Sequence, residues 1–178
     1  MTARFVNDYI KIYAEIGRGE FVGRYHMMPV LVGKRILSLG MERGRSAYET
    51  FSIIPVQDVE SLSPGSFLDR VWMLERTRKK DNDQDIIVGR WKKYDVAIPD
   101  YSISRIHCVF EISSRGYLVR DAGSRNGTIV DGNTLRKGEG VMILGGEQLT
   151  LGRFQFVFYT GRQFLDLLME RLSKQRRK

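Results

Sequence analysis

The sequence predicts a mainly β fold, an antiparallel β-sandwich with a helical and β-rich N-terminal extension and a C-terminal helix. Between residues 67 and 160, short apolar runs typical of strands alternate with turn signals, and no helical period interrupts them. The runs read VWMLERT, DIIVGR, DVAIP, HCVFEIS, GYLVRDA, TIVDG, QLTLG and FQFVFYT. This succession of short strands is typical of an antiparallel sandwich.

The first 66 residues differ in pattern from the sandwich region. They begin with apolar residues at helical spacing, which predict a helix over residues 3–16 that ends at the glycines of residues 17–19. Three β-rich runs follow, FVGRYHMMPVLVG, RILSLG and YETFSIIPV, and then the linker signal SLSPGS at residues 61–66. No motif in this segment indicates a chemistry, so we predict an extension of unassigned function over residues 1–66.

The chain ends in a predicted amphipathic helix. Over residues 162–174, Phe and Leu side chains lie along one side and Arg and Lys along the other. The predicted division of the chain is therefore 1–66 for the extension, 67–160 for the sandwich and 161–178 for the basic helix. The two predicted helices can pack on each other, on the sandwich or on a second copy of the chain, and the pattern leaves these alternatives open.

Composition excludes several classes of protein. With 42% hydrophobic and 28% charged residues, the chain is an ordinary globular protein. No apolar run approaches the roughly 18 residues that a membrane span needs, and the N-terminus lacks a secretory signal core, so a cytoplasmic protein without membrane insertion is expected. The single cysteine, Cys108, has apolar neighbours and is interpreted as a small core residue. No Cys or His pair has metal-ligand spacing, so neither a metal nor another cofactor is expected.

The formal net charge of +8 is concentrated at one end of the chain. Residues 161–178 carry 6 basic and 2 acidic side chains and so hold half of the excess. This pattern favours a solvated basic helix, with weak attraction to an acidic partner or to nucleic acid as the alternative. Because the sandwich region offers no evident aromatic stacking platform beside its basic loops, nucleic acid is not an expected partner.

Four short motifs follow one another in the sandwich region. Gly89-Arg90 closes a predicted strand, SRIH at 104–107 opens another, NGT stands at 126–128, and Asp131-Gly132 follows. In this order the motifs resemble the forkhead-associated (FHA) family, whose signature is GR, then SxxH, then NGT. The resemblance extends over about residues 70–160 and identifies the predicted fold as an FHA-type β-sandwich.

The resemblance implies a site that binds phosphothreonine peptides and catalyses nothing. Arg90 supplies a planar fork of donors suited to phosphate oxygens, and Ser104 can donate its hydroxyl to another oxygen. Arg105 and Arg125 add positive charge, although the family often has a small hydroxyl residue at the position of Arg125. Asn126 is expected both to form a tight turn and to bond the ligand main chain. In the family, the threonine methyl group fills a small apolar slot.

Other motif residues are expected to be structural. Gly89 is expected to permit close backbone packing, and His107 to be partly buried and hydrogen-bonded to backbone. Gly127 and Thr128 complete the turn motif. The two lysines at 92–93 either steer an acidic peptide or remain solvated.

The function implied by the resemblance is phosphothreonine-dependent protein recognition in Ser/Thr kinase signalling. The expected partners are a Thr-phosphorylated protein or peptide and an upstream Ser/Thr protein kinase, with self-association left open. The alternative is a phospho-independent scaffold or oligomerisation protein that uses its N-terminal extension and C-terminal helix. Thr50, preceded by Glu49 and followed three places later by Ile53, is a candidate internal phospho-ligand, with an ordinary strand residue as the other interpretation.

Overall fold

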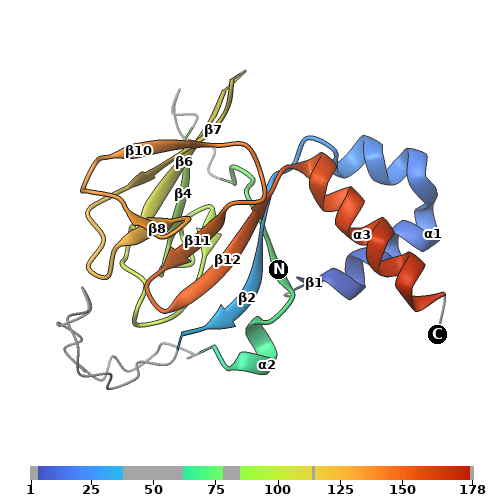
Figure 1. Ribbon diagram of the computed structural model, residues 1–178, viewed down its shortest axis with the longest axis horizontal. Coiled ribbons are helices and arrows are strands. Elements are labelled where there is room, and N and C mark those ends of the chain that lie inside the picture. Colours follow the sequence, from blue (N-terminus) through green and yellow to red (C-terminus); the bar gives the residue numbers. More distant parts are fainter. Residues whose placement is uncertain (1–3, 38–61, 78–84, 114, 177–178) are drawn as a thin grey trace.

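The computed structural model describes residues 4–37, 62–77, 85–113 and 115–176. Two β-sheets pack face to face, and two helices lie beside them (Figure 1). The predicted fold class, a β-sandwich with helices near both ends of the chain, is confirmed. Thr50 and the run YETFSIIPV lie outside the described residues.

Among the described residues, the larger sheet has seven strands in the order β1-β3-β2-β12-β11-β8-β9. Its strands are β1 (Arg4–Phe5), β2 (Val30–Ile36), β3 (Arg70–Met73), β8 (Thr128–Val130), β9 (Asn133–Thr134), β11 (Gln148–Leu151) and β12 (Phe154–Tyr159). The smaller sheet has the order β10-β7-β6-β4-β5, with only its β4–β5 pair parallel. Its strands are β4 (Ile86–Gly89), β5 (Val96–Ala97), β6 (Cys108–Ser113), β7 (Gly116–Asp121) and β10 (Gly140–Ile143).

The first helix is longer than predicted. It is α1 (Val6–Tyr25), and the predicted stop at residue 17 is a kink, because Gly17 has a φ of 76° inside the helix. The prediction of β structure around Phe21 is therefore wrong. Phe21 is buried, and its ring packs 5.4 Å from that of Tyr13 and 4.6 Å from that of Tyr25. This aromatic packing within one helix outweighs the β tendency of the segment.

Strand β2 lies in the interior of the larger sheet. It is hydrogen-bonded to β3 on one side and to β12 on the other, with Val30 opposite Tyr159. Leu31 faces the core between the two sheets, whereas Val30 and Val32 face the helices, which explains why consecutive residues are all buried. The segment before residue 66 thus supplies part of the sandwich, while the predicted boundary itself stays a prediction.

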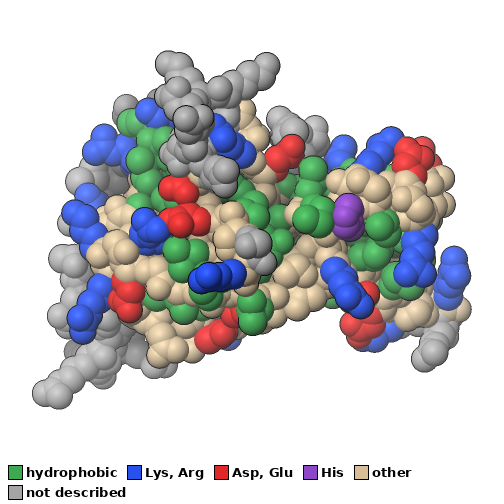
Figure 2. Space-filling view, turned by 90° about the horizontal axis from the view of Figure 1, so that it is seen from above, with side chains coloured by type: hydrophobic (Ala, Val, Ile, Leu, Met, Phe, Trp, Pro, Cys, Tyr) green, Lys and Arg blue, Asp and Glu red, His purple; other side chains and the backbone are tan. Residues whose placement is uncertain are grey.

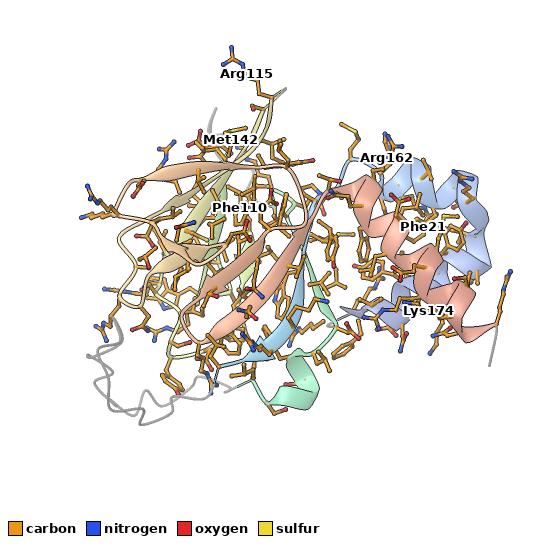
Figure 3. All side chains as sticks on the ribbon, in the orientation of Figure 1. Phe21, Phe110, Arg115, Met142, Arg162 and Lys174 are labelled. Atoms are coloured by element: carbon orange, nitrogen blue, oxygen red, sulfur yellow. The ribbon has the colours of Figure 1, made fainter. Side chains whose placement is uncertain are left out.

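The helices cover the outer side of the larger sheet and form a second core. Helix α3 (Gly161–Gln175) packs on α1, with the rings of Tyr9 and Phe164 5.3 Å apart and nearly perpendicular. Figure 3 shows Phe21 among the helices and Phe110 between the sheets. In the structure the helices pack on each other and on the sandwich. Cys108 is fully buried between the sheets, which confirms its interpretation as a core residue.

One short segment differs from its prediction, whereas the predicted C-terminal helix is confirmed. The linker signal at 61–66 runs into a helical turn, α2 (Pro64–Phe67), because Phe67 is fully buried against Trp72 and Phe154 at ring distances of 5.4 and 4.8 Å. Helix α3 begins where Thr160 and Gln163 exchange hydrogen bonds, with the Thr160 Oγ1 accepting from the Gln163 N–H at 3.3 Å.

The surface carries mixed charge. Figure 2 shows one face, on which Lys and Arg side chains are spread over the sandwich and the helices and alternate with Asp and Glu. None of the described helices is long and apolar enough to cross a membrane. Within the described ranges, His, Cys, Asp and Glu side chains form no cluster of metal-ligand type.

Candidate functional site

The motif residues meet at one end of the smaller sheet. Strand β4 ends at Gly89, β6 starts at Cys108 and β7 ends at Asp121, and these strands are antiparallel neighbours. Antiparallel pairing brings the end of one strand beside the start of the next. Arg115, at the tip of the β6–β7 hairpin, marks the opposite end of this sheet (Figure 3).

Ser104 is the residue at which the three loops are joined. Its backbone N–H donates to Nδ1 of His107 at 3.1 Å. Its carbonyl oxygen accepts from the backbone N–H of Arg90 at 3.0 Å. Its Oγ accepts from the backbone N–H of Arg125 at 2.9 Å. These bonds leave the hydroxyl O–H of Ser104 unused as a donor. Because the side chain is half-exposed, this O–H can donate to a ligand oxygen.

His107 fixes the geometry of this junction. The ring is fully buried, and its Nε2 lies 3.0 Å from the carbonyl oxygen of Gly127. Because Nδ1 accepts from Ser104, Nε2 must carry the proton and donate to Gly127. Burial lowers the pKa of His107, although the hydrogen bond to Gly127 and the Asp121 charge oppose this effect. The neutral imidazole therefore joins two loops.

A buried carboxylate organises the loop after β7. The Oδ1 of Asp121 accepts from the backbone N–H groups of Gly123 and Ser124 at 2.8 and 3.0 Å. Its Oδ2 accepts from the hydroxyls of Ser124 and Thr128 at 2.6 and 2.7 Å. Burial alone would raise the pKa of Asp121, but these hydrogen bonds together lower it. This role of Asp121 was not predicted, although an Asp followed closely by Gly and Ser is a signal for such a turn.

Asn126 is tied to the loop before β6. Its Nδ2 donates to the carbonyl oxygen of Ser102 at 2.7 Å. Ser102 is fully buried, and its own backbone N–H donates to Oδ1 of Asp100 at 2.9 Å. Its Oγ accepts from the backbone N–H of Arg153 at 3.3 Å. The half-buried Asn126 side chain is therefore held by a hydrogen-bonded buried residue, and the contribution of Arg153 was not predicted from the sequence.

Gly89 lies against the loop that carries the serine. A Cβ atom at this position would overlap the backbone carbonyl oxygen of Arg105. Only glycine allows β4 and the loop to approach so closely. This close approach keeps Arg90 beside Ser104.

Three loops bring together the predicted binding residues and their positive charges. Arg90 is half-buried, whereas Arg105, Arg125 and the lysines at 92–93 are exposed. Ser104 is hydrogen-bonded to the backbone of Arg125, and Asn126 follows Arg125 in the same loop. The end of the sheet is therefore strongly basic.

An aromatic pair lies within this basic region. Trp91 and Tyr94 have nearly parallel rings, with an interplanar angle of 6° and a centroid separation of 6.4 Å, and Trp91 is 39% exposed. The prediction that the basic loops lack an aromatic platform is therefore wrong. Two aromatic residues three apart in a loop gave no periodic signal, so the pairing became visible only once the loop was folded.

Comparison with known proteins identifies the sandwich. Residues 86–152 match the model of the FHA domain family. The chain therefore contains an FHA domain, and the resemblance seen in its motifs is confirmed. The matched range contains every predicted site residue from Gly89 to Thr128.

Several curated proteins are similar to this chain. The glycogen accumulation regulator GarA of Mycobacterium tuberculosis is 32% identical over 111 residues, which are 60% of this chain and 65% of that protein. The oxoglutarate dehydrogenase inhibitor of Corynebacterium glutamicum is 32% identical over 74 residues, 41% of this chain and 49% of that protein. The chain thus spans 65% or less of the length of these two relatives.

Solved structures of FHA domains are also similar in fold. A domain from Arabidopsis thaliana matches with a TM-score of 0.49 and 20% identity, over 76% of this chain and 87% of that one. The N-terminal FHA domain of Saccharomyces cerevisiae Rad53p, solved with a phosphothreonine peptide, matches with a TM-score of 0.44 and 18% identity. The match covers 53% of this chain and 86% of that one.

Proposed function

We propose that this protein is a phosphothreonine-dependent recognition module whose ligands are proteins phosphorylated by a Ser/Thr protein kinase. The observation that carries the proposal is the bonding of Ser104: its backbone is joined to that of Arg90, its Oγ accepts from the N–H of Arg125, and its hydroxyl can still donate to a ligand. A phosphate with a charge of about −1.5 to −2 accepts such donors well. We propose Arg90, Ser104, Arg105, Arg125 and Asn126 as the binding residues.

The hydrogen bonds of His107 favour binding over catalysis. A serine nucleophile needs a neighbouring base that accepts its hydroxyl proton. Nδ1 of His107 instead accepts from the backbone N–H of Ser104, and Nε2 faces the carbonyl of Gly127. Neither ring nitrogen is thus available to Ser104 Oγ. The names of the relatives, a regulator and an inhibitor, fit a protein that acts by binding.

We also propose that the folded recognition unit is larger than residues 67–160. Strand β2 pairs with β12, and its Leu31 belongs to the core between the sheets. The described part of the segment 1–66 is then partly sandwich and partly helical cover. Helix α3, within the basic segment 161–178, packs on that cover through Phe164.

Calorimetry with peptides tests the proposal. A phosphothreonine peptide should bind with micromolar affinity and its unphosphorylated form should not, because charge-assisted hydrogen bonds contribute about 1.5–3 kcal/mol each. The matched phosphoserine peptide should bind several-fold more weakly, because burying one methyl group is worth about 0.8 kcal/mol. A phosphopeptide library that yields no binder would overturn the proposed function.

A further inference from the structure

The loop after β4 carries a cluster of rings and cations, here called the Trp91 ledge and made of Trp91, Lys93, Tyr94 and Arg105. The Lys93 Nζ lies 4.6 Å from the centroid of the Trp91 ring and 5.2 Å from that of Tyr94. The Arg105 guanidinium carbon lies 5.3 Å from the Trp91 centroid. Two cations from separate loops are thus held on one indole ring.

The Trp91 ledge adjoins the proposed phosphate site. Trp91 follows Arg90 in the chain and Arg105 follows Ser104, and the backbones of Arg90 and Ser104 are joined by a hydrogen bond of 3.0 Å. The ledge therefore lies one residue beyond the phosphate-binding pair on both loops. A peptide whose phosphate sits on that pair brings its neighbouring residues towards the ledge.

Within the described ranges, the cations of the ledge have no carboxylate partner. No ion pair there engages Lys93, Arg105 or the nearby Lys92. The nearest acid in the same loop, Asp95, instead accepts from the backbone N–H groups of Ile87 and Thr77, both at 2.9 Å. The described part of the protein thus leaves these cations open to an external anion.

Cations that lie over the Trp91 ring can bind an anion with a defined geometry. A guanidinium held over an indole ring keeps the N–H donors at its edge free, and that edge matches the two oxygens of a carboxylate or a phosphate. The side chain also loses less freedom on binding, because Trp91 already restricts it. A freely solvated arginine would lack both advantages.

We propose that the Trp91 ledge binds a second anionic group of the ligand, next to the phosphothreonine in the peptide. The ligands would then be acidic phosphothreonine segments, with either an Asp or Glu carboxylate or a second phosphate as the anion. This inference rests on the proposed function and deepens it. Trp91 acts as a positioning residue for Arg105, and Lys93 adds a direct charge.

The test compares matched peptides on the full chain by calorimetry. One phosphothreonine peptide carries alanine at all flanking positions, a second set carries a single Glu at each flanking position in turn, and a third carries a single second phosphate there. At physiological salt, one position should bind roughly three- to tenfold more tightly with Glu than with Ala, and a phosphate there should bind at least as tightly. In about 1 M salt the preference should fall towards one, because the Debye length shortens to about 3 Å.

Two variants locate the effect. Lys93→Ala should remove most of the preference for the acidic peptide, while the affinity for the alanine-flanked peptide changes less than about twofold. Trp91→Ala should also remove most of the preference, and because it releases Arg105 it should weaken the alanine-flanked peptide as well, but by a smaller factor than the acidic one. Arg115→Ala, at the opposite end of the sheet, is the control with the same loss of charge as Lys93→Ala and should leave the preference intact.

The outcomes separate this inference from the proposed function. If phosphothreonine peptides bind and the acidic and alanine-flanked peptides bind equally, the inference is wrong and the proposed function stands. The same holds if the preference survives in both Trp91→Ala and Lys93→Ala. If no phosphothreonine peptide binds at all, both are wrong. Displacement of the acidic peptide by duplex DNA at physiological salt would assign the ledge to nucleic acid and overturn the inference.

Discussion

Arg153 and Asp100 form an ion pair beneath the proposed binding loops, with Nη2 of Arg153 2.6 Å from Oδ2 of Asp100. The Asp100 side chain is fully buried, and that of Arg153 is only 16% exposed. The same carboxylate accepts the N–H of Ser102, whose carbonyl receives the side chain of Asn126. The ion pair therefore supports a residue that is proposed to contact the ligand.

Replacing Arg153 by Ala should be strongly destabilising. It leaves the Asp100 carboxylate buried without its partner, and the loss of one member of a buried pair costs about 3–5 kcal/mol. Urea denaturation measures the change in the free energy of unfolding, and Arg115→Ala is the exposed control. A loss below about 1 kcal/mol would show that the pair is not essential to the loop.

Replacing Arg90 by Ala should lower phosphopeptide affinity by about ten- to a hundredfold, which corresponds to one or two charge-assisted hydrogen bonds. The fold should survive, because the backbone bond from Arg90 to Ser104 does not need the side chain. Calorimetry gives the affinity, and a thermal melt confirms the fold. Unchanged affinity in a folded variant would remove Arg90 from the site.

Replacing Gly89 by Ala should disturb both stability and binding. The added Cβ would overlap the carbonyl oxygen of Arg105, so the loop must shift, at a cost of about 1–3 kcal/mol. Gly23→Ala is a matched control, because a Cβ there meets no atom within 4 Å and the position is helical. That variant should be neutral or slightly stabilising. Equal melting temperatures for the two variants would contradict the close approach at Gly89.

Stability should fall as the pH drops below about 6.5, the ordinary pKa of histidine. The folded protein has a lowered pKa at His107, so the unfolded chain binds a proton first. The contribution of neutral His107 is complete above pH 6.5 and is lost as the pH falls towards the folded pKa, at about 1.4 kcal/mol for each unit between the two values. NMR titration of the ring measures the folded pKa. A midpoint at or above 6.5 would contradict the prediction.

A chain that starts at residue 67 should not fold. It lacks β2, so β3 and β12 lose the strand that joins them and the core loses Leu31. Circular dichroism and a melt should show no cooperative transition, whereas residues 4–176 should give one. A stable shortened chain that binds phosphopeptide would instead support the predicted boundary at 66.

The motif signals explain how much could be predicted. Gly89-Arg90, SRIH and NGT each stand at a strand end, so the sequence indicated the sandwich and the loops that meet in the site. Strand β10 was not predicted, because it follows a run of charged and glycine residues. Its residues also do not alternate between apolar and polar, since the exposed Met142 is as apolar as the buried Ile143 beside it. Phe21 is helical because its ring packs on those of Tyr13 and Tyr25. The contact with Tyr13 also depends on the direction in which the helix continues after the kink at Gly17, and a local pattern does not show that direction.

The support beneath the site could not be predicted for a different reason. Arg153 and Asp100 are far apart in sequence, and each alone reads as a surface residue. The stacking of Arg105 on Trp91 likewise joins two loops whose relation is set by strand pairing. Long-range contacts of charged residues leave no local pattern, so such networks become visible only in three dimensions.

The pairing of β2 with β12 also constrains how the protein is made. Val30 emerges from the ribosome long before its partner Tyr159, and at about 5–20 residues per second the wait is on the order of ten seconds. Contacts of such high sequence separation also slow folding itself, since a long loop must close before the pairing contributes. During this interval the apolar strand VLV has β3 as its only available neighbour, and its edge towards β12 stays unpaired. The nascent chain therefore passes through an aggregation-prone stage that ends only when the last strand has been synthesised.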